Sequence, residues 1–334
     1  MDMRVSGSDT QPGYFVLSLD TELAFGHFDR DAQWPRLFSP DGSRERAAIQ
    51  RLLELCEAFG VRATWAVVGH LFHAGCEHCP ECPIEAWQGR YSSYAQIYER
   101  DHPLWYGADV LQWLLAHRDR LEIGFHGYTH RPFTALSAAE AAQEARLWQA
   151  VAARHGIEPG AVVFPRNAVA HLAVLRQFGF RSFRSADAVR PRGWRSTLGA
   201  PLKLLSQMAG WPPPETCAVA AIGLRDGLVE LPPSAYLFDI RRSVECLLDG
   251  LGLQRLRLRG IVAGIRQAAA TGRVIHLWAH PWEFRTEADF DKLAHVLAAF
   301  AEQRMAGRMR SVTMSELAAL STGARQAASQ GGEP

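Results

Sequence analysis

The stretch YFVLSLDTE, residues 14–22, is an apolar run rich in aromatic and aliphatic side chains that ends in two acids. Such a run predicts a buried strand of a parallel sheet, because strands covered on both faces have nearly continuous apolar sequences. Asp20 and Glu22 are two residues apart, so extended backbone places both side chains on one side. The stretch therefore predicts a buried strand that presents a pair of carboxylates at its carboxyl end.

Strands of this type recur along the chain, and segments of helical period separate them. The further strand candidates are residues 62–69, 121–126, 161–166, 180–185, 228–231, 273–278 and 310–314. The helix candidates are residues 44–59, 108–118, 137–155, 168–178, 244–270 and 287–305. This alternation indicates an α/β protein and predicts a distorted (β/α) barrel with seven or eight parallel strands.

We expect one domain, since no linker divides the middle of the chain. The predicted organisation is a flexible N-terminus over residues 1–13, a barrel over 14–320 and a disordered tail over 321–334, which is rich in small and polar residues. An insertion in the barrel, about residues 70–107, carries many aromatic residues and cysteines. Its rings suit sugar binding, or they pack the insertion onto the barrel.

Composition limits the function classes. The formal net charge of +1 gives no global reason to expect a nucleic-acid partner. The first residues have no apolar core of a signal peptide, and no window has 18 uninterrupted apolar residues. These features predict a soluble, cytoplasmic protein whose six cysteines are thiols or metal ligands and not disulfides.

Chemically capable side chains follow several of the predicted strands, where catalytic residues of parallel barrels lie. They are Asp20, Glu22, His126, His130, Arg166 and His280. Carboxylates and imidazoles are ligands that zinc accepts, and three protein ligands plus one water is a common catalytic composition. His276 and His280 also form an H-x-x-x-H pair, but strand residues four apart are separated by about 13 Å, so they do not share an ion.

The pattern resembles the polysaccharide deacetylases of carbohydrate esterase family four over roughly residues 14–317. That resemblance implies a distorted barrel that hydrolyses N- or O-acetyl groups on sugars. It implies that Asp20 is the general base and that one divalent metal ion, Zn²⁺ in our expectation, is held by Glu22, His126 and His130. The sequence LWAH, residues 277–280, matches the late family motif and makes His280 the general acid, which leaves His276 as barrel packing.

The remaining family roles are assigned to residues whose match to the family motifs is less regular. Arg166, in the sequence PRN at residues 165–167, corresponds to the arginine that orients the base, although the family's usual residue order differs. A backbone N–H near Asn167 is the candidate oxyanion donor, and Asp187 the candidate that orients His280. Asn167, Trp278 and Trp282 are candidate substrate contacts.

The resemblance implies a mechanism that sets opposite protonation states on two groups. The metal activates a water, Asp20 takes a proton from it, and cationic His280 protonates the leaving amine. Because Asp20 must be ionised while His280 is charged, the expected pH profile is bell-shaped.

Two further features leave alternatives open. His73, Cys76, Cys79 and Cys82 predict either a second metal site or a thiol-rich loop. The arginine-rich region is either a solvated helix face or a clamp for a phosphate-bearing substrate; its members are Arg241, Arg242, Arg255, Arg257, Arg259 and Arg266. The clamp would suit a nucleotide- or lipid-linked sugar used to build surface polysaccharide or another glycoconjugate. The competing functions are a non-sugar amidohydrolase, such as a deformylase or a ureide hydrolase, and a noncatalytic carbohydrate-binding protein.

Overall fold

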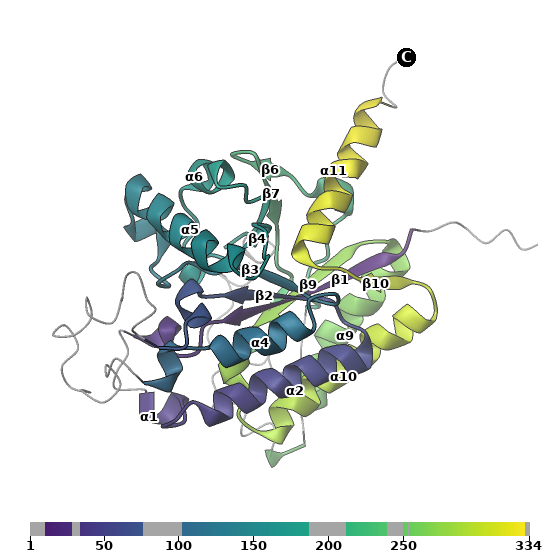
Figure 1. The fold of residues 1–334 in the computed structure, drawn as a ribbon. Helices are drawn as coiled ribbons and strands as arrows, with labels where there is room; N and C mark the ends of the chain where they lie inside the picture. The colour runs from purple at the N-terminus through teal and green to yellow at the C-terminus, as the bar shows by residue number, and fades with distance from the viewer. Residues whose placement is uncertain are drawn as a thin grey trace, which may run out of the picture.

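A computed structural model describes residues 11–28, 34–75, 102–186, 212–238, 250–252 and 254–330. Within them, a curled and mostly parallel sheet forms a distorted half-barrel with helices packed on its outer side (Figure 1). The predicted α/β barrel class is therefore confirmed. No helix of the described part is both long and apolar enough to span a membrane.

The sheet has ten strands in the order β6-β7-β5-β4-β3-β2-β1-β9-β8, and β10 pairs with β1. The strands are β1 (Gly13–Thr21), β2 (Ala63–Val67), β3 (Glu122–Phe125), β4 (Ala161–Val162), β5 (Ser182–Arg184), β6 (Leu224–Arg225), β7 (Leu228–Leu231), β8 (Ala235–Tyr236), β9 (Val274–Ala279) and β10 (Met309–Ser311). Among the paired strands of the described residues, only β6 and β7 run antiparallel. All eight predicted strands are present, and the two-residue strands β6 and β8 are additions.

Helices cover the sheet, and all but the first and the last of those described lie at positions that the apolar periodicity predicts. They are α1 (Trp34–Leu37), α2 (Ser43–Phe59), α4 (Ala108–Ala116), α5 (Ala138–Ala153), α6 (Leu172–Gln177), α9 (Gln254–Thr271), α10 (Glu287–Met305) and α11 (Met314–Gln330). Ser137 and Glu140 form a capping box at the start of α5. Gly60 ends α2 with φ of 67°, a left-handed conformation that glycine adopts without strain.

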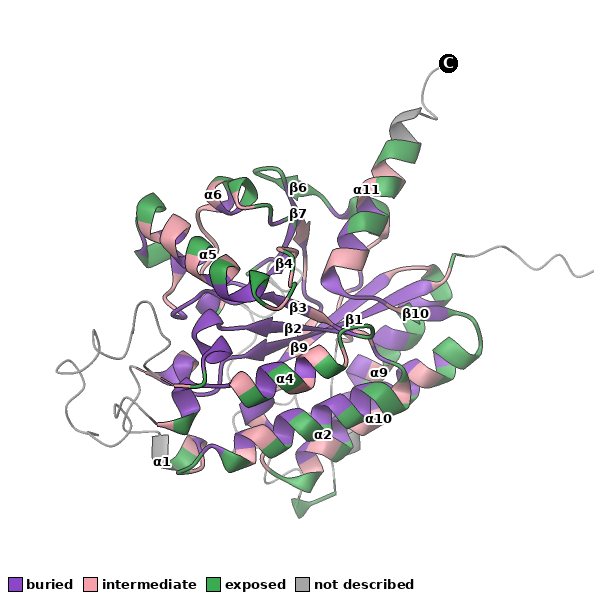
Figure 2. Cartoon of the chain, viewed as in Figure 1, coloured by how far each residue is buried: buried purple, intermediate pink, exposed green. Residues whose placement is uncertain are grey.

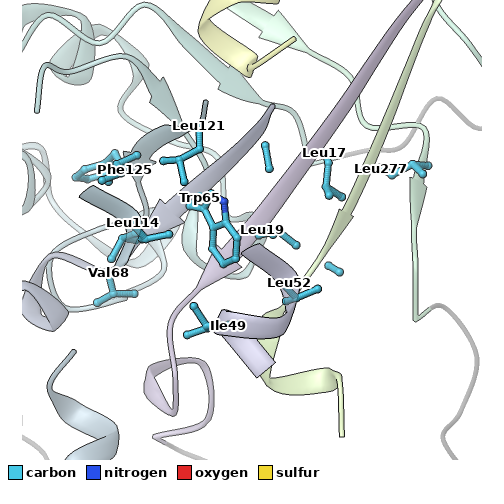
Figure 3. Close-up of a cluster of buried hydrophobic side chains, with 14 of the residues drawn as sticks. Leu17, Leu19, Ile49, Leu52, Trp65, Val68, Leu114, Leu121, Phe125 and Leu277 are labelled. Atoms are coloured by element: carbon cyan, nitrogen blue, oxygen red, sulfur yellow. The ribbon is translucent and has the colours of Figure 1, made fainter. Parts of the chain in front are cut away.

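Strand β1 organises the core because it pairs along both edges, with β9 on one side and with β2 and β10 on the other. Its alternate residues enter different cores. Leu17 and Leu19 belong to the large core on the helix side, where Leu19 lies near Trp65 and Leu52 (Figure 3). Tyr14 and Val16 belong to a smaller cluster on the concave side of the sheet. β1 and its neighbours are accordingly buried on both faces (Figure 2).

Helix α11 differs from the predicted disordered tail. It continues to Gln330, with Ser321 fully buried and the Arg325 side chain donating to the carbonyl of Ile222. Composition misled the prediction because alanine and glutamine, which are common in disordered chains, are also good helix formers. Residues 331–334 and 1–10 lie outside the described part, and Gly13 already belongs to β1.

The predicted insertion at residues 70–107 lies mostly outside the described part, which omits 76–101. Of its aromatic residues, Phe72, Trp105 and Tyr106 are described and are buried. Trp105 meets Phe25 edge to face at 5.1 Å between ring centroids, and Tyr106 lies 5.1 Å from the His70 ring. These two residues therefore pack onto the barrel.

We predict that Leu317→Ala lowers the free energy of unfolding by about 2–5 kcal/mol, since Leu317 is 1% exposed in the concave cluster. Leu320→Ala, on the same helix at 38% exposure, is the matched control and should cost under about 0.5 kcal/mol. Chemical denaturation measures both. Equal small effects of the two substitutions would mean that packing of α11 against the concave cluster adds little to stability.

Candidate metal and catalytic centre

Three buried side chains from two strand ends meet at the carboxyl end of the sheet. Glu22 follows β1, and His126 and His130 follow β3. Nε2 of His130 lies 2.7 Å, and Nε2 of His126 3.3 Å, from Oε2 of Glu22. Their ligand atoms all lie within 4.8 Å of one another, so this group could hold a metal ion.

The chemistry of the three residues fits a divalent cation. The Nδ1–H of His126 donates to the carbonyl of Val163 at 2.9 Å, which leaves the Nε2 lone pair facing Glu22. Neither ring nitrogen of His130 has a hydrogen-bond partner in good geometry among the described residues. Burial lowers the pKa of His130, which favours the neutral form that binds metals. A buried nitrogen without a partner is costly, and a cation would satisfy it.

Neighbouring side chains fix Glu22 in this position. The indole N–H of Trp282 donates to Oε1 of Glu22 at 3.0 Å. Burial opposes the charge of Glu22, but His130 and His280 outweigh it and hold the pKa of the carboxyl well below its usual range. Glu22 therefore remains an ionised ligand, with one oxygen directed to the histidines and the other to Trp282.

The loop between the two histidines is held by Glu144 of α5. Its carboxylate accepts the backbone N–H groups of Tyr128 at 2.6 Å and Thr129 at 2.9 Å, and also the Thr129 hydroxyl. Gly127 has φ of 73° and His130 has φ of 59°. The left-handed turn at His130 costs backbone energy, and the Glu144 contacts compensate for it. No local pattern in the sequence points to Glu144, which stands 14 residues after His130.

Asp20 lies beside the metal-binding group and is paired with Arg184 of β5. The two guanidinium Nη atoms contact its two oxygens at 2.7 and 2.6 Å. Arg184 is 1% exposed and also donates to Ser18 at 3.1 Å and to the side-chain oxygen of Asn167 at 3.0 Å. Burial favours the neutral acid, but the charge and hydrogen bonds of Arg184 outweigh it and lower the pKa of Asp20. Asp20 is thus an ionised acid with a fixed orientation.

Arg184 occupies the position that the sequence predicts for Arg166. β4 ends at Val162 and the chain then turns, with Arg166 at φ of 55°. The Arg166 side chain is exposed, donates to the carbonyl of Gly26 at 3.4 Å and lies over the Phe28 ring. The predicted oxyanion donor is a backbone N–H near Asn167; the N–H of Asn167 itself donates to the carbonyl of Phe164 at 2.9 Å.

His280 completes the centre from the end of β9. Its Nε2 lies 3.8 Å from Oδ2 of Asp20 and 4.0 Å from Oε1 of Glu22. Its Nδ1 donates to Glu283 at 2.9 Å, and the Tyr236 hydroxyl donates to the other oxygen of Glu283. Burial opposes the imidazolium, but Glu283 and Glu22 outweigh it and raise the pKa of His280 to about 9.

Glu283 makes the contact predicted for Asp187, which lies outside the described residues. The signal was present in the sequence, because Glu283 stands three residues after His280 and caps the short helix that His280 begins. His276, predicted as barrel packing, is fully buried and lies 2.9 Å from the Ser18 hydroxyl. Burial and the nearby charge of Arg184 lower the pKa of His276 to about 3, so it is neutral.

The predicted second metal site cannot be assembled from the described part of the chain. His73 is buried, and its Nε2 lies 3.0 Å from the hydroxyl of Tyr128. Cys76, Cys79 and Cys82 lie outside the described residues, so the second site stays a prediction.

No protein-family model matches the sequence, and comparison with curated protein sequences gives no significant match. Among solved structures, a proposed polysaccharide deacetylase from Mycobacterium smegmatis is similar, with a TM-score of 0.58 and 17% identity over 96% of this chain and 93% of the other. The Xyl-CE4 domain of a xylanase from the hindgut metagenome of Trinervitermes trinervoides gives 0.44 and 13% over 92% and 90%. A chitin deacetylase from Colletotrichum lindemuthianum gives 0.44 and 13% over 92% and 88%. The first of these shows that the chain has a polysaccharide-deacetylase-like fold, as the sequence resemblance implies.

We predict that Gly26→Ala weakens metal binding by about 10-fold or more, because a Cβ at this position would lie 2.6 Å from the carboxyl carbon of Glu22. The matched control is Gly223→Ala, whose Cβ would meet nothing within 4 Å. Calorimetric titration of metal-free protein with Zn²⁺ gives both affinities. Unchanged binding in Gly26→Ala would exclude Glu22 as a ligand.

Proposed function

We propose that this protein is a metal-dependent hydrolase that removes an acetyl group from an N-acetylated sugar. The observation that carries the proposal is the placement of an ionised acid and a cationic histidine beside one buried metal-binding group. Nε2 of His280 lies 3.8 Å from Oδ2 of Asp20 and 4.0 Å from Oε1 of Glu22, which forms the metal-binding group with His126 and His130. The polysaccharide-deacetylase-like fold supports the choice of an acetylated sugar as substrate.

The bound ion, Zn²⁺ in our proposal, would supply an activated water and polarise the acyl carbonyl. Asp20 accepts the proton of the attacking water, because Arg184 keeps its carboxylate ionised and oriented. His280 donates a proton from Nε2 to the departing amine, while Glu283 holds its other nitrogen. The two proton transfers therefore belong to groups that face the same space.

We further propose a biosynthetic role on a nucleotide- or lipid-linked sugar. Arg241 and Arg242, the first two arginines of the predicted phosphate clamp, lie outside the described residues. In the described part, Arg266 of α9 is exposed and lies 3.6 Å from Glu302 of α10, as the solvated-face alternative predicts. Support for a phosphate-bearing substrate therefore comes from sequence composition alone.

The first test joins metal analysis of the purified protein to an acetate-release screen over N-acetylated nucleotide sugars and chito-oligomers. We expect about one divalent ion per chain and release of acetate from at least one sugar. Metal without any acetate release would favour the carbohydrate-binding alternative, and release of another acyl product from a non-sugar amide would favour the amidohydrolase. Hydrolysis by metal-free protein would contradict the proposed mechanism.

We predict that Asp20→Asn lowers kcat by about 10²- to 10⁴-fold while metal content is unchanged, because Asp20 moves a proton and lies outside the metal-binding group. Asp119→Asn is the matched control at an exposed acid, whose side chain is 72% exposed. Steady-state acetate release and metal analysis measure the two effects. Full activity of Asp20→Asn would remove it from the reaction.

Glu283→Gln should move the alkaline limb of the pH–rate profile to lower pH. Glu283 contributes to a pKa of about 9 at His280, so the histidine is protonated below that pH and loses its proton above it. Without the carboxylate the pKa falls, and the proton donor disappears at a lower pH. The exposed residue Glu287 gives a matched control, Glu287→Gln, whose profile should equal wild type. An unmoved alkaline limb in Glu283→Gln would assign that limb to another group.

A further inference from the structure

Trp278 lies on β9 two residues before His280, and both of its ring faces are covered. The Tyr236 ring stacks on it, with centroids 4.3 Å apart and an interplanar angle of 24°. The guanidinium carbon of Arg184 lies 4.2 Å from the Trp278 ring centroid. Two groups this close to one ring would overlap on a single face, so they lie on opposite faces. The sequence predicts Trp278 as a substrate contact, but with both faces covered the ring is not an open platform for a sugar.

The two neighbours of Trp278 hold the two groups that move protons. Arg184 contacts both oxygens of Asp20. Tyr236 donates to Glu283, which in turn accepts from Nδ1 of His280. A continuous series of contacts thus joins the acid to the histidine, and its members in order are Asp20, Arg184, Trp278, Tyr236, Glu283 and His280.

The contacts with Trp278 restrict motions of the Arg184 guanidinium and the Tyr236 ring that their hydrogen bonds do not prevent. The Nη atoms of Arg184 bond in the guanidinium plane to Asp20, Ser18 and Asn167. The indole face of Trp278 limits rotation of the Arg184 guanidinium out of this plane. An aromatic face also attracts a cation that lies over it. Tyr236 pairs in register with Trp278 on adjacent parallel strands, so its phenol cannot tilt away without leaving the stack.

We infer that Trp278 is a positioning residue that fixes the general base and the general acid relative to each other. The inference rests on the proposed function, and it assigns Trp278 to orientation of the reacting groups and not to substrate binding. Small displacements of such groups can cost about 10²-fold in rate, which sets the size of the expected effect.

The test compares Trp278→Leu with Trp278→Phe in metal-loaded protein. Leucine offers no flat face to Arg184 or Tyr236, so we expect kcat to fall by about 10- to 100-fold with KM and metal content unchanged. Phenylalanine offers two aromatic faces and should restore most of kcat. Trp113→Leu, at a half-buried tryptophan of α4, is the matched control and should leave kcat at the wild-type value.

A rise in KM with kcat preserved would overturn the inference in favour of a sugar contact, and loss of metal would reassign Trp278 to support of the metal-binding group. Wild-type kcat in Trp278→Leu would also overturn it. A second readout separates this inference from the proposed function, because it needs no substrate. The Nδ1–H signal of His280 in the NMR spectrum should broaden through faster exchange with water in Trp278→Leu and stay as sharp as in wild type in Trp278→Phe; an equally sharp signal in the leucine variant would overturn the inference even if no sugar is hydrolysed.

Discussion

The buried ion pair between Arg184 and Asp20 is the interaction on which the arrangement of the centre depends. A guanidinium inside a barrel loses most of its hydration, and this cost is offset only when its donors and its face find partners. Here the two Nη atoms donate to Asp20, Ser18 and Asn167, and Trp278 covers one face, while the buried Nε has no hydrogen-bond partner among the described residues. The pair forms a polar layer between the apolar cluster on the concave side and the metal-binding group above it.

Burial alone would make every titratable group in this centre neutral, so the charged states identify the residues with strong partners. Asp20 stays ionised because Arg184 faces it, and His280 stays cationic because Glu283 holds its Nδ1. His130 has the carboxylate of Glu22 nearby but remains shifted toward the neutral form by burial. Neighbouring groups whose pKa values are pushed apart in this way are suited to opposite roles, a base, an acid and a neutral ligand.

The sequence predicted those parts of the centre that are local to a strand end, and it misplaced those that depend on how strands neighbour one another. Asp20 and Glu22 follow an unmistakable apolar run, and two histidines follow another. The family resemblance assigns the base-orienting arginine to Arg166, yet β4 ends at Val162 and the chain turns before that residue. Arg184 is the last residue of the short strand β5, and no local pattern reports the sheet order that brings it to Asp20 of β1.

Trp278 and Trp282, which the sequence predicts as substrate contacts, show the same dependence on three-dimensional neighbours. An aromatic residue beside a catalytic histidine suits both substrate stacking and support of the centre, and the sequence does not distinguish them. In the structure, the indole N–H of Trp282 donates to Glu22, and Trp278 lies between Arg184 and Tyr236. Both rings exclude water from ionised groups without competing for the hydrogen bonds that orient them.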